Sequence, residues 1–177
     1  MVSSYEWFST TRMIGMASFA ASLTGCTARW RGRGGNASRR LVFAILAGVQ
    51  FVLLLDMAFN WRWSLHQFFM DEAMAYGVYG RRGLPQLIGV LTLAGMAVFS
   101  SALMLMRFRD RAGTALAVMG TLLSLDMWCL EVLSFHPVDH VLYSMIGGAM
   151  TVSYIWIALS MVTCLGAWLD HRGYAQC

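Results

Sequence analysis

The chain has 177 residues, of which 58% are hydrophobic and only 12% are charged, and its formal net charge is +4. All thirteen basic residues are Arg, which excludes chemistry that needs a lysine amine, such as a retinal or pyridoxal Schiff base. The low charge content predicts a membrane protein. Because the Arg residues lie between apolar runs, we interpret their charge as a topology signal and not as a nucleic-acid surface.

The first apolar run, Met13 to Ala28, is short and is diluted by Ser, Thr and Gly. Since about 20 apolar residues are needed to cross a bilayer, we leave open whether this run spans the membrane as a fifth helix. Its segment Leu23-Thr-Gly-Cys26 has the form of a lipoprotein cleavage box, but the Arg residues that follow resist export. We therefore expect a short helix or an interfacial segment, followed by a basic loop up to residue 40.

Four longer runs predict transmembrane helices. They are Leu41–Asn60, Leu84–Met106, Ala112–Phe135 and Val141–Leu169. The predicted fold class is an all-α, polytopic transmembrane helix bundle over residues 41–169, with a tail at 170–177. Glycines such as Gly113, Gly120, Gly147 and Gly148 are expected to let helices pack closely.

The Arg residues orient the predicted helices. One cluster runs from Arg29 to Arg40 and another from Arg107 to Arg111, and both are expected on the cytoplasmic side. The connections 61–83 and 135–140 then face outward, and the C-terminus is cytoplasmic. Residues 63–76 predict an amphipathic helix that projects outward or lies along the interface.

Several charged residues fall on the outward side. Asp56 precedes Arg62 by less than two helical turns, and Arg62 and His66 share one face if the helix continues. Asp56 and Asp126 are acids inside predicted spans, where they need a shared proton or a cation. Glu131 is expected near the boundary, where Arg62, Arg81 or Arg82 are candidate charge and docking partners.

The segment Glu131-Val-Leu-Ser-Phe-His-Pro-Val-Asp-His140 is crowded with polar groups between two apolar runs. Its residues, together with one histidine of the preceding outward segment, form a candidate set of ligands for a transition metal. The set is His66, Glu131, His136, Asp139 and His140. A haem ligated by His66 and His136 is a second cofactor hypothesis.

A structural interpretation of the same segment stays open beside the metal site. Pro137 disfavours a helical conformation at His136 and ends the preceding helix, and Asp139 can cap the last helix. The histidines can then be boundary residues that bind carboxylates or lipid head groups. His171, at the other end of the last run, is expected to be a solvated tail residue.

Two segments carry a family resemblance. Arg62-Trp-Ser-Leu-His66 through Tyr79-Gly-Arg-Arg82, together with Ser134-Phe-His-Pro-Val-Asp139, resembles a pattern in small, uncharacterised bacterial four-helix integral membrane proteins. The resemblance covers roughly residues 41–169. It implies a four-helix core in a bacterial cytoplasmic membrane and implies no activity.

Three functions remain as hypotheses. The small size and the lack of a nucleophile–base pair favour a non-catalytic subunit or scaffold of a larger membrane complex, with lipid, other subunits or further copies of the chain as partners. The second hypothesis is a metal- or haem-binding redox or binding module at the outer face. The third is a small proton-coupled transporter or channel that uses Asp56, Asp126 and Glu131. No catalytic residue is predicted.

Overall fold

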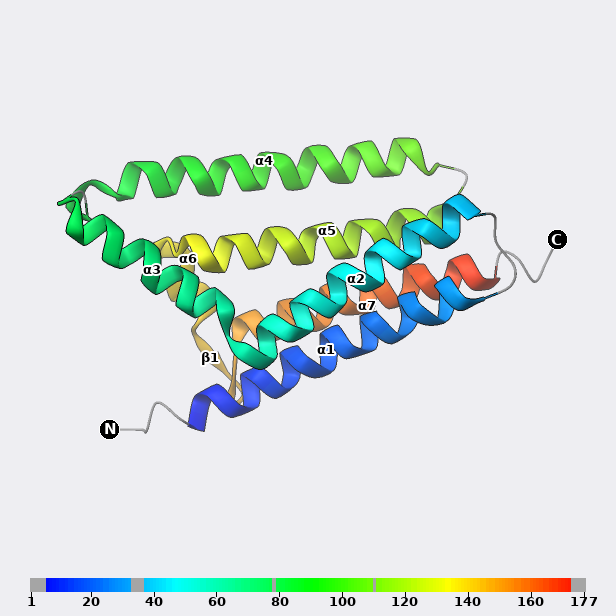
Figure 1. Ribbon diagram of the computed structural model, residues 1–177, viewed down its shortest axis with the longest axis horizontal. Coiled ribbons are helices and arrows are strands. Elements are labelled where there is room, and N and C mark those ends of the chain that lie inside the picture. The colour runs from blue at the N-terminus through cyan, green and yellow to red at the C-terminus, as the bar shows by residue number, and fades with distance from the viewer. Residues whose placement is uncertain (1–5, 33–36, 78, 110, 173–177) are drawn as a thin grey trace.

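The computed structural model describes residues 6–32, 37–77, 79–109 and 111–172. Almost all of this part of the chain is helical (Figure 1). The elements in chain order are α1 (Glu6–Arg31), α2 (Ala37–Phe59), α3 (Trp61–Ala75), the 3-10 turn η1 (Tyr79–Arg81), α4 (Gly83–Arg107), α5 (Ala112–Leu133), α6 (His136–Leu142), β1 (Met145–Ile146), β2 (Ala149–Met150) and α7 (Thr151–Arg172).

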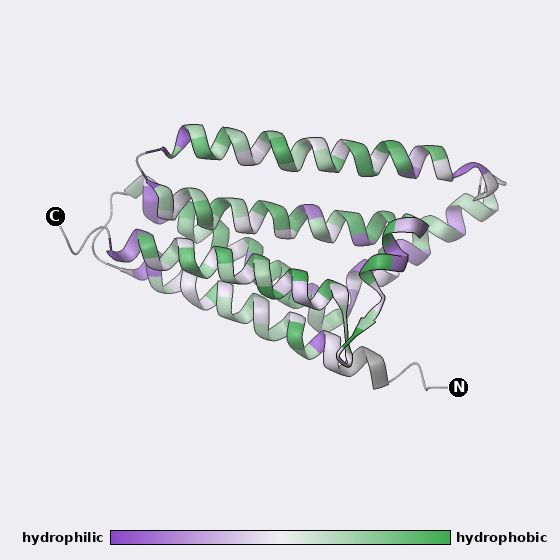
Figure 2. Ribbon diagram, turned by 180° about the vertical axis from the view of Figure 1, so that it is seen from behind, coloured by the Kyte–Doolittle hydropathy of each residue, from purple (hydrophilic) through white to green (hydrophobic). Residues whose placement is uncertain are grey.

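Four helices of the described chain, α2, α4, α5 and α7, are long and apolar enough to cross a membrane. This confirms the predicted fold class, an all-α bundle of membrane-spanning helices. Figure 2 shows that hydrophobic residues cover most of these helices, whereas hydrophilic residues gather at their ends. The bounds of α2, α4 and α5 lie within a few residues of the predicted runs.

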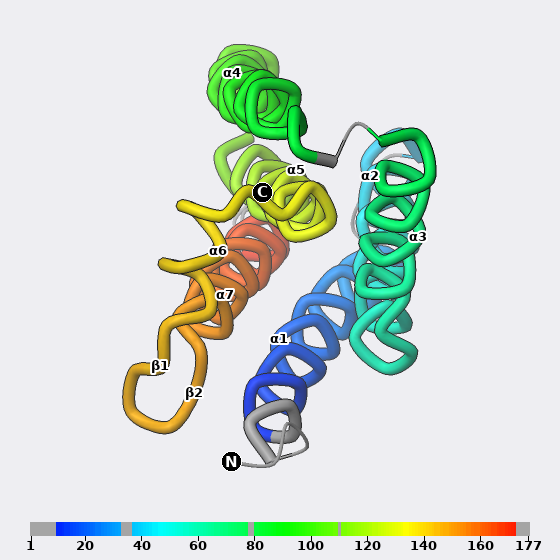
Figure 3. The backbone as a smooth tube through the Cα atoms, turned by 90° about the vertical axis from the view of Figure 1, so that its left-hand side faces the viewer, coloured from blue at the N-terminus to red at the C-terminus, as the bar shows by residue number. Residues whose placement is uncertain are grey.

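The first helix is longer than its apolar run predicts. α1 has 26 residues, roughly 39 Å at 1.5 Å per residue, and it packs along both α2 and α7 (Figure 3). Small polar side chains make this close packing feasible. The hydroxyls of Ser22 and Ser160 are 2.8 Å apart, and Ser160 donates to the carbonyl of Ser18 at 2.6 Å. Hydroxyls that pair between helices satisfy polar groups without water.

α5 and α7 touch at backbone level. A Cβ atom added to Gly166 of α7 would lie 2.3 Å from the backbone nitrogen of Ala117, and one added to Gly113 of α5 would lie 2.4 Å from that of Asp170. No real side chain fits at such distances, so these two glycines are required by the packing. The prediction that Gly113 and Gly120 allow close helix packing is confirmed, since a Cβ at Gly120 would lie 2.4 Å from Thr163 Oγ1.

The chain turns sharply between α2 and α3. Asn60 adopts a left-handed conformation, with φ 60° and ψ 39°, which asparagine tolerates better than most residues. α3 then leaves the bundle obliquely and reaches the start of α4 (Figure 1). The helix predicted over residues 63–76 is therefore present, separated from α2 by this turn.

The structure corrects the start of the last span. The predicted run began at Val141, but that residue lies in α6, and α7 begins at Thr151. Gly147 and Gly148 do not form a packing surface within a helix. They make the turn of the β1–β2 hairpin, with φ 59° and 86°, a backbone conformation that favours glycine.

α4 is the least covered of the long helices. None of its residues is buried, and its main neighbour is α5 (Figure 3). Gly89 faces Leu133 of α5 closely, whereas a Cβ at Gly95 would meet nothing within 4 Å. A half-buried stripe of α4, which recurs at helical spacing from residue 86 to residue 104, thus faces the bundle, and the rest of the helix is open to its surroundings.

The described ends of the bundle differ in charge. The α1–α2 and α4–α5 connections lie at one end together with the last turn of α7, and we call this the Arg-rich end (Figure 1). The opposite end, which we call the α3 end, carries α3, α6 and the hairpin. The two connections that carry the Arg clusters thus lie at the same end of the bundle, and the side of the membrane that this end faces stays a prediction.

Candidate functional site

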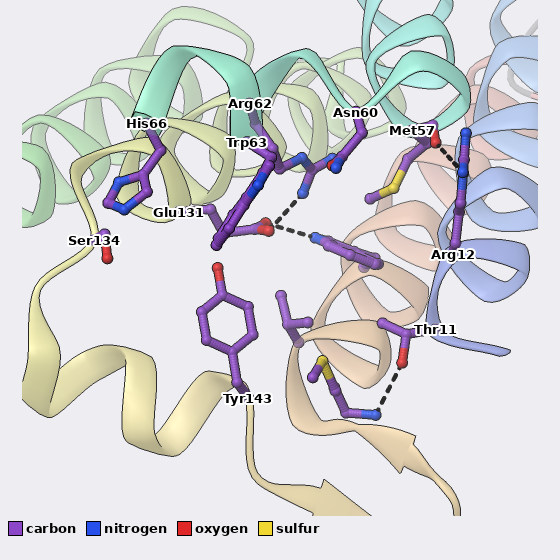
Figure 4. Close-up of a pocket in the computed structure, with 13 residues that line it drawn as sticks. Thr11, Arg12, Met57, Asn60, Arg62, Trp63, His66, Glu131, Ser134 and Tyr143 are labelled. Atoms are coloured by element: carbon purple, nitrogen blue, oxygen red, sulfur yellow. Dashed lines mark hydrogen bonds and ion pairs between the residues drawn. The ribbon is translucent and has the colours of Figure 1, made fainter. Parts of the chain in front are cut away.

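A cavity of about 420 Å³ lies at the α3 end, among α1, α3, α5 and α7. Its walls are largely apolar, and polar groups from several helices reach into it (Figure 4). The residues that line it are Thr11, Arg12, Met57, Asn60, Arg62, Trp63, His66, Glu131, Ser134, Tyr143, Met150, Val152 and Trp156.

Arg62 is the centre of a buried ion cluster at this cavity. Its Nη1 lies 2.5 Å from Glu131 Oε2, and its Nη2 lies 2.6 Å from Asp56 Oδ2. All three residues are at most 9% exposed. Such pairs repay the cost of desolvation only when the geometry and the remaining hydrogen bonds are good. The structure thus confirms Arg62 as the cation that meets Glu131.

Asp56 holds the corner between α2 and α3. Its Oδ1 accepts the backbone N–H of Arg62 at 2.8 Å, while Oδ2 accepts Nε of the same residue at 2.6 Å. The first N–H groups of a helix have no partner within it, and a carboxylate is also favoured at the positive end of the helix dipole. One aspartate therefore fixes both the start of α3 and the guanidinium that α3 carries.

Trp156 of α7 completes the cluster. Its Nε1 donates to Glu131 Oε1 at 3.1 Å, and the guanidinium of Arg62 lies 5.1 Å from the centre of its ring. Burial works to lower the pKa of Arg62, but the charges of Glu131 and Asp56 outweigh it, so the pKa is raised and the cation persists. With one cation and two carboxylates, the cluster has a formal charge of −1.

Tyr143 stands at the side of the cavity with its hydroxyl directed toward Trp63 and Glu131 (Figure 4). In the described part of the chain this hydroxyl makes no hydrogen bond. Although Tyr143 is 38% exposed overall, partial desolvation of its hydroxyl, and then the negative charges of Glu131 and Asp139, raise the pKa of the phenol. The hydroxyl therefore remains protonated and can donate a hydrogen bond to a molecule in the cavity.

α1 contributes residues that the sequence reasoning missed. Arg12 Nε donates to the carbonyl of Met57 at 2.8 Å, and its Nη2 donates to that of Ala58. The last carbonyls of a helix lack partners, so a cation there stabilises the end of α2. A signal was present in the sequence: Arg12 lies outside the Arg-rich connections, so it needed a partner of its own.

The predicted metal ligands are not brought together. Within the described residues there is no group of three or more His, Cys, Asp or Glu side chains that could hold a metal ion. Glu131 is engaged by Arg62 and Trp156, and Asp139 accepts the hydroxyl of Ser134 at 2.5 Å. His136 and His140 are exposed.

Because the last span begins at Thr151 and not at Val141, the expected role of Asp139 as its cap is wrong. Asp139 does not cap that span but lies in the first turn of the short helix α6, with Pro137 near the beginning of the same helix. His66 lies on the same face of α3 as Arg62, as its spacing predicts, and both residues line the cavity. The Nδ1 atom of His66 lies 3.3 Å from the carbonyl oxygen of Val132. When Nδ1 carries the proton and donates it to that carbonyl, Nε2 is an acceptor.

Asp126 does not join Asp56. It lies about two helical turns before Leu133, hence on the same stripe of α5, and Leu133 faces α4. The side chain is half-buried and makes no hydrogen bond or ion pair to a described residue. The expected sharing of a proton between Asp56 and Asp126 is therefore not seen, because Arg62 occupies Asp56.

The other two predicted docking residues, Arg81 and Arg82, lie after α3 in the chain, away from Glu131. Arg81 is exposed in η1. Arg82 is half-buried and lines a second, smaller cavity instead of contacting Glu131. Of the three arginines expected near Glu131, the ion pair is therefore made by Arg62. His171 is exposed, as expected for a tail residue.

A second buried ion cluster lies at the Arg-rich end and was not predicted. Asp170 of α7 is 6% exposed; its Oδ2 lies 2.5 Å from Arg29 Nε, and its Oδ1 accepts Thr114 Oγ1 at 2.6 Å. Arg39 Nη1 approaches Oδ1 at 3.7 Å. The cluster thus connects α1, α2, α5 and α7. It faces no cavity described here, so we interpret it as structural.

No protein family, curated protein or solved structure matches the chain. The resemblance to small bacterial four-helix membrane proteins stays a prediction.

Proposed function

We propose that this membrane protein is a binding module that holds a small amphipathic molecule in the cavity at the α3 end. The observation that carries the proposal is the cavity itself, because its volume of about 420 Å³ falls within the range of small-molecule sites. Its lining has the usual composition of such sites, with a mostly apolar wall and a few fixed polar groups.

The charges at the cavity disfavour an anionic ligand. Arg62 is already bound by Asp56 and Glu131, and Arg12 is bound to the end of α2. What remains is apolar surface from Met57, Met150 and Val152, together with the hydroxyl of Tyr143. An anion would find no free counter-charge here without breaking an existing pair, which is costly for buried groups, and it would be repelled by the net formal charge of −1 of the cluster.

The position of the cavity adds to the proposal. With the Arg-rich end in the cytoplasm, the cavity opens at the outer boundary of what we propose is a bacterial cytoplasmic membrane. A molecule that dissolves in the bilayer can reach it from the lipid. The role of the ion cluster is then to hold α3 over the cavity, and the cluster does not itself bind the ligand.

The experiment measures binding of a neutral amphiphile to the full-length protein in detergent. Native mass spectrometry of the protein titrated with monolaurin should show one bound molecule. Tyr143→Phe should weaken binding about tenfold, the value of one hydrogen bond. The matched control is Tyr154→Phe, because the hydroxyl of Tyr154 donates to the carbonyl of Ile146 and lines no described cavity. Equal binding by both variants, or no bound molecule, would contradict the proposal.

A second function, subunit of a larger membrane complex, is favoured by α4. This helix has no buried residue, and Asp126 lies on the α5 stripe facing it without a partner among the described residues. An acid inside a membrane generally pairs with another group, and a partner helix could supply one.

Site-specific photo-crosslinking tests this second function. A benzophenone side chain at Val98 of α4, which is 72% exposed, should give one protein adduct of defined mass in native membranes, identified by mass spectrometry. At Met161 of α7, which is 66% exposed, it should react only with lipid. Identical patterns at the two positions would argue against a partner on α4.

A further inference from the structure

A second cavity of about 370 Å³ lies among α3, α4 and α5. It has an apolar floor and wall, to which Phe69, Met70 and Ala73 of α3 and Val132 and Leu133 of α5 contribute. It lies beside α4, whose residues are all at least partly exposed. The second cavity is therefore bordered by the least covered helix of the molecule, where a chain from the lipid can enter.

His66 lines both cavities. It is carried by α3, and its Nδ1 lies 3.3 Å from the carbonyl of Val132, so the ring stands between α3 and α5. The ion cluster and Tyr143 are on one side of this histidine, and the apolar wall of the second cavity is on the other. The two cavities are thus adjacent; the first has charged and polar groups in its wall, whereas the wall of the second is mainly apolar.

The polar groups around the second cavity leave little for a charged head group. Gln86 donates to the carbonyls of Leu133 and Ser134, at 3.2 and 2.9 Å. Arg82 also has a partner in the structure. Trp128 Nε1 lines the second cavity as a buried donor without a hydrogen-bond partner among the described residues, so one uncharged donor remains there. In the first cavity Tyr143 offers a donor, and His66, which lines both cavities, offers an acceptor at Nε2 when its Nδ1 donates to Val132. A molecule that fills both cavities would place its polar part in the first and its apolar part in the second.

We propose that the ligand is a neutral, single-chain amphiphile whose head binds in the first cavity and whose alkyl chain passes His66 into the second cavity. This inference rests on the proposed function, since it extends the same site. It names the ligand class: a hydroxyl- or carbonyl-bearing head that Tyr143 and His66 can bind, and one chain. A short head-group analogue then binds through the first cavity alone.

Chain length separates the two cavities experimentally. Each buried methylene contributes about 0.8 kcal/mol, or about fourfold in affinity. The probes are monobutyrin, with a four-carbon chain, and monolaurin, with a twelve-carbon chain. Because both also partition into detergent, the quantity of interest is the ratio of each dissociation constant between a variant and the unaltered protein.

Ala73→Trp fills the second cavity, and Ala75→Trp is the matched control, because Ala75 is exposed on the same helix and lines neither cavity. Ala73→Trp should weaken monolaurin binding at least tenfold and leave monobutyrin binding unchanged. Ala75→Trp should change neither. Lysophosphatidylglycerol, which has a charged head, should bind at least tenfold more weakly than monolaurin.

A second measurement needs no variant. Cys129 lines the second cavity, whereas Cys164 lies in α7 and lines neither cavity. Monolaurin, but not monobutyrin, should slow alkylation of Cys129 by N-ethylmaleimide while Cys164 reacts at an unchanged rate, as measured by peptide mass spectrometry. This readout holds even where Ala73→Trp disturbs folding.

The outcomes distinguish the two proposals. If neither probe binds, or if binding ignores Tyr143→Phe, the proposed function itself is overturned. If monolaurin binds and depends on Tyr143, but Ala73→Trp has no effect and Cys129 is not protected, the chain does not occupy the second cavity and this inference alone is overturned. Binding of lysophosphatidylglycerol as tight as that of monolaurin would overturn the inference that the ligand has a neutral head group.

Discussion

Arg62 and Glu131 are 69 positions apart in the chain, and their side chains meet at 2.5 Å between Nη1 and Oε2. The contact joins α3 to α5, and Asp56 extends it to α2 while Trp156 extends it to α7. One guanidinium thus fixes the oblique helix over the end of the bundle. The cavity owes its shape to this cluster, because Arg62 and Glu131 both line it.

Arg62→Met is expected to destabilise the protein strongly. It leaves Asp56 and Glu131 buried without their cation, and loss of one partner from a buried pair costs about 3–5 kcal/mol. Unfolding in detergent, followed by circular dichroism, measures the loss. Arg81→Met is the control, because Arg81 is exposed, and it should change stability by at most about 0.5 kcal/mol. Similar losses of unfolding free energy in both variants would show that the buried ion cluster stabilises the protein no more than an exposed arginine does.

Asp170→Asn should weaken the Arg-rich end. The variant amide turns an N–H donor toward either Arg29 or Thr114, both of which donate to the aspartate, so a loss of about 3 kcal/mol is expected. Asp71→Asn, at an exposed position, provides the comparison. Combining Asp170→Asn with Arg29→Met should cost less than the sum of the single changes by at least about 0.5 kcal/mol. Strict additivity would contradict direct pairing.

Gly166→Ala tests the contact between α5 and α7. The added Cβ would lie 2.3 Å from the backbone nitrogen of Ala117, so the helices must separate, and overpacking of this kind costs about 1–3 kcal/mol. Gly95→Ala makes the same chemical change where nothing lies within 4 Å. It should be neutral or stabilise by up to about 1 kcal/mol, because alanine favours helix. The measurement is the unfolding free energy of each variant, and a Gly166→Ala variant as stable as Gly95→Ala would contradict the close contact between α5 and α7.

The ionisation of Tyr143 should make the stability of the folded protein fall at alkaline pH. Tyr143 is 38% exposed, but partial desolvation of its hydroxyl and the nearby charges of Glu131 and Asp139 raise its pKa in the folded protein, whereas an unfolded tyrosine ionises near pH 10. The unfolded state therefore loses its proton first, and stability contributed by Tyr143 is complete below pH 10 and is lost as the pH rises above it. The melting temperature of Tyr143→Phe should fall less between pH 9 and pH 11.5 than that of the unaltered protein. Parallel curves would contradict this.

The sequence predicted the spans because long apolar runs are a direct consequence of bilayer thickness. It also indicated the meeting of Arg62 with Glu131, since each charge lies next to apolar residues and needs a counter-charge. The start of α7 could not be predicted in the same way. Gly147 and Gly148 suit both a helix interface and a tight turn, and their positive φ angles depend on the hairpin that they close.

The cavity was harder to predict than the ion cluster. Trp156 and Tyr143 look like ordinary residues of an apolar boundary, and their role depends on how α7 and α6 are placed by the hairpin between them. The tail predicted at residues 170–177 includes Asp170, because the last apolar run ends at Leu169. The helix in fact continues to Arg172, so Asp170 faces α1 and α5 while His171 and Arg172 remain exposed.

The backbone contact between α5 and α7 limits how this molecule can move. With glycine at the crossing there are no side chains that can change rotamer to let the two helices slide or tilt, so the pair behaves as a rigid block. The walls that α5 and α7 give to the cavity, among them Glu131 and Trp156, are therefore held at fixed positions relative to each other.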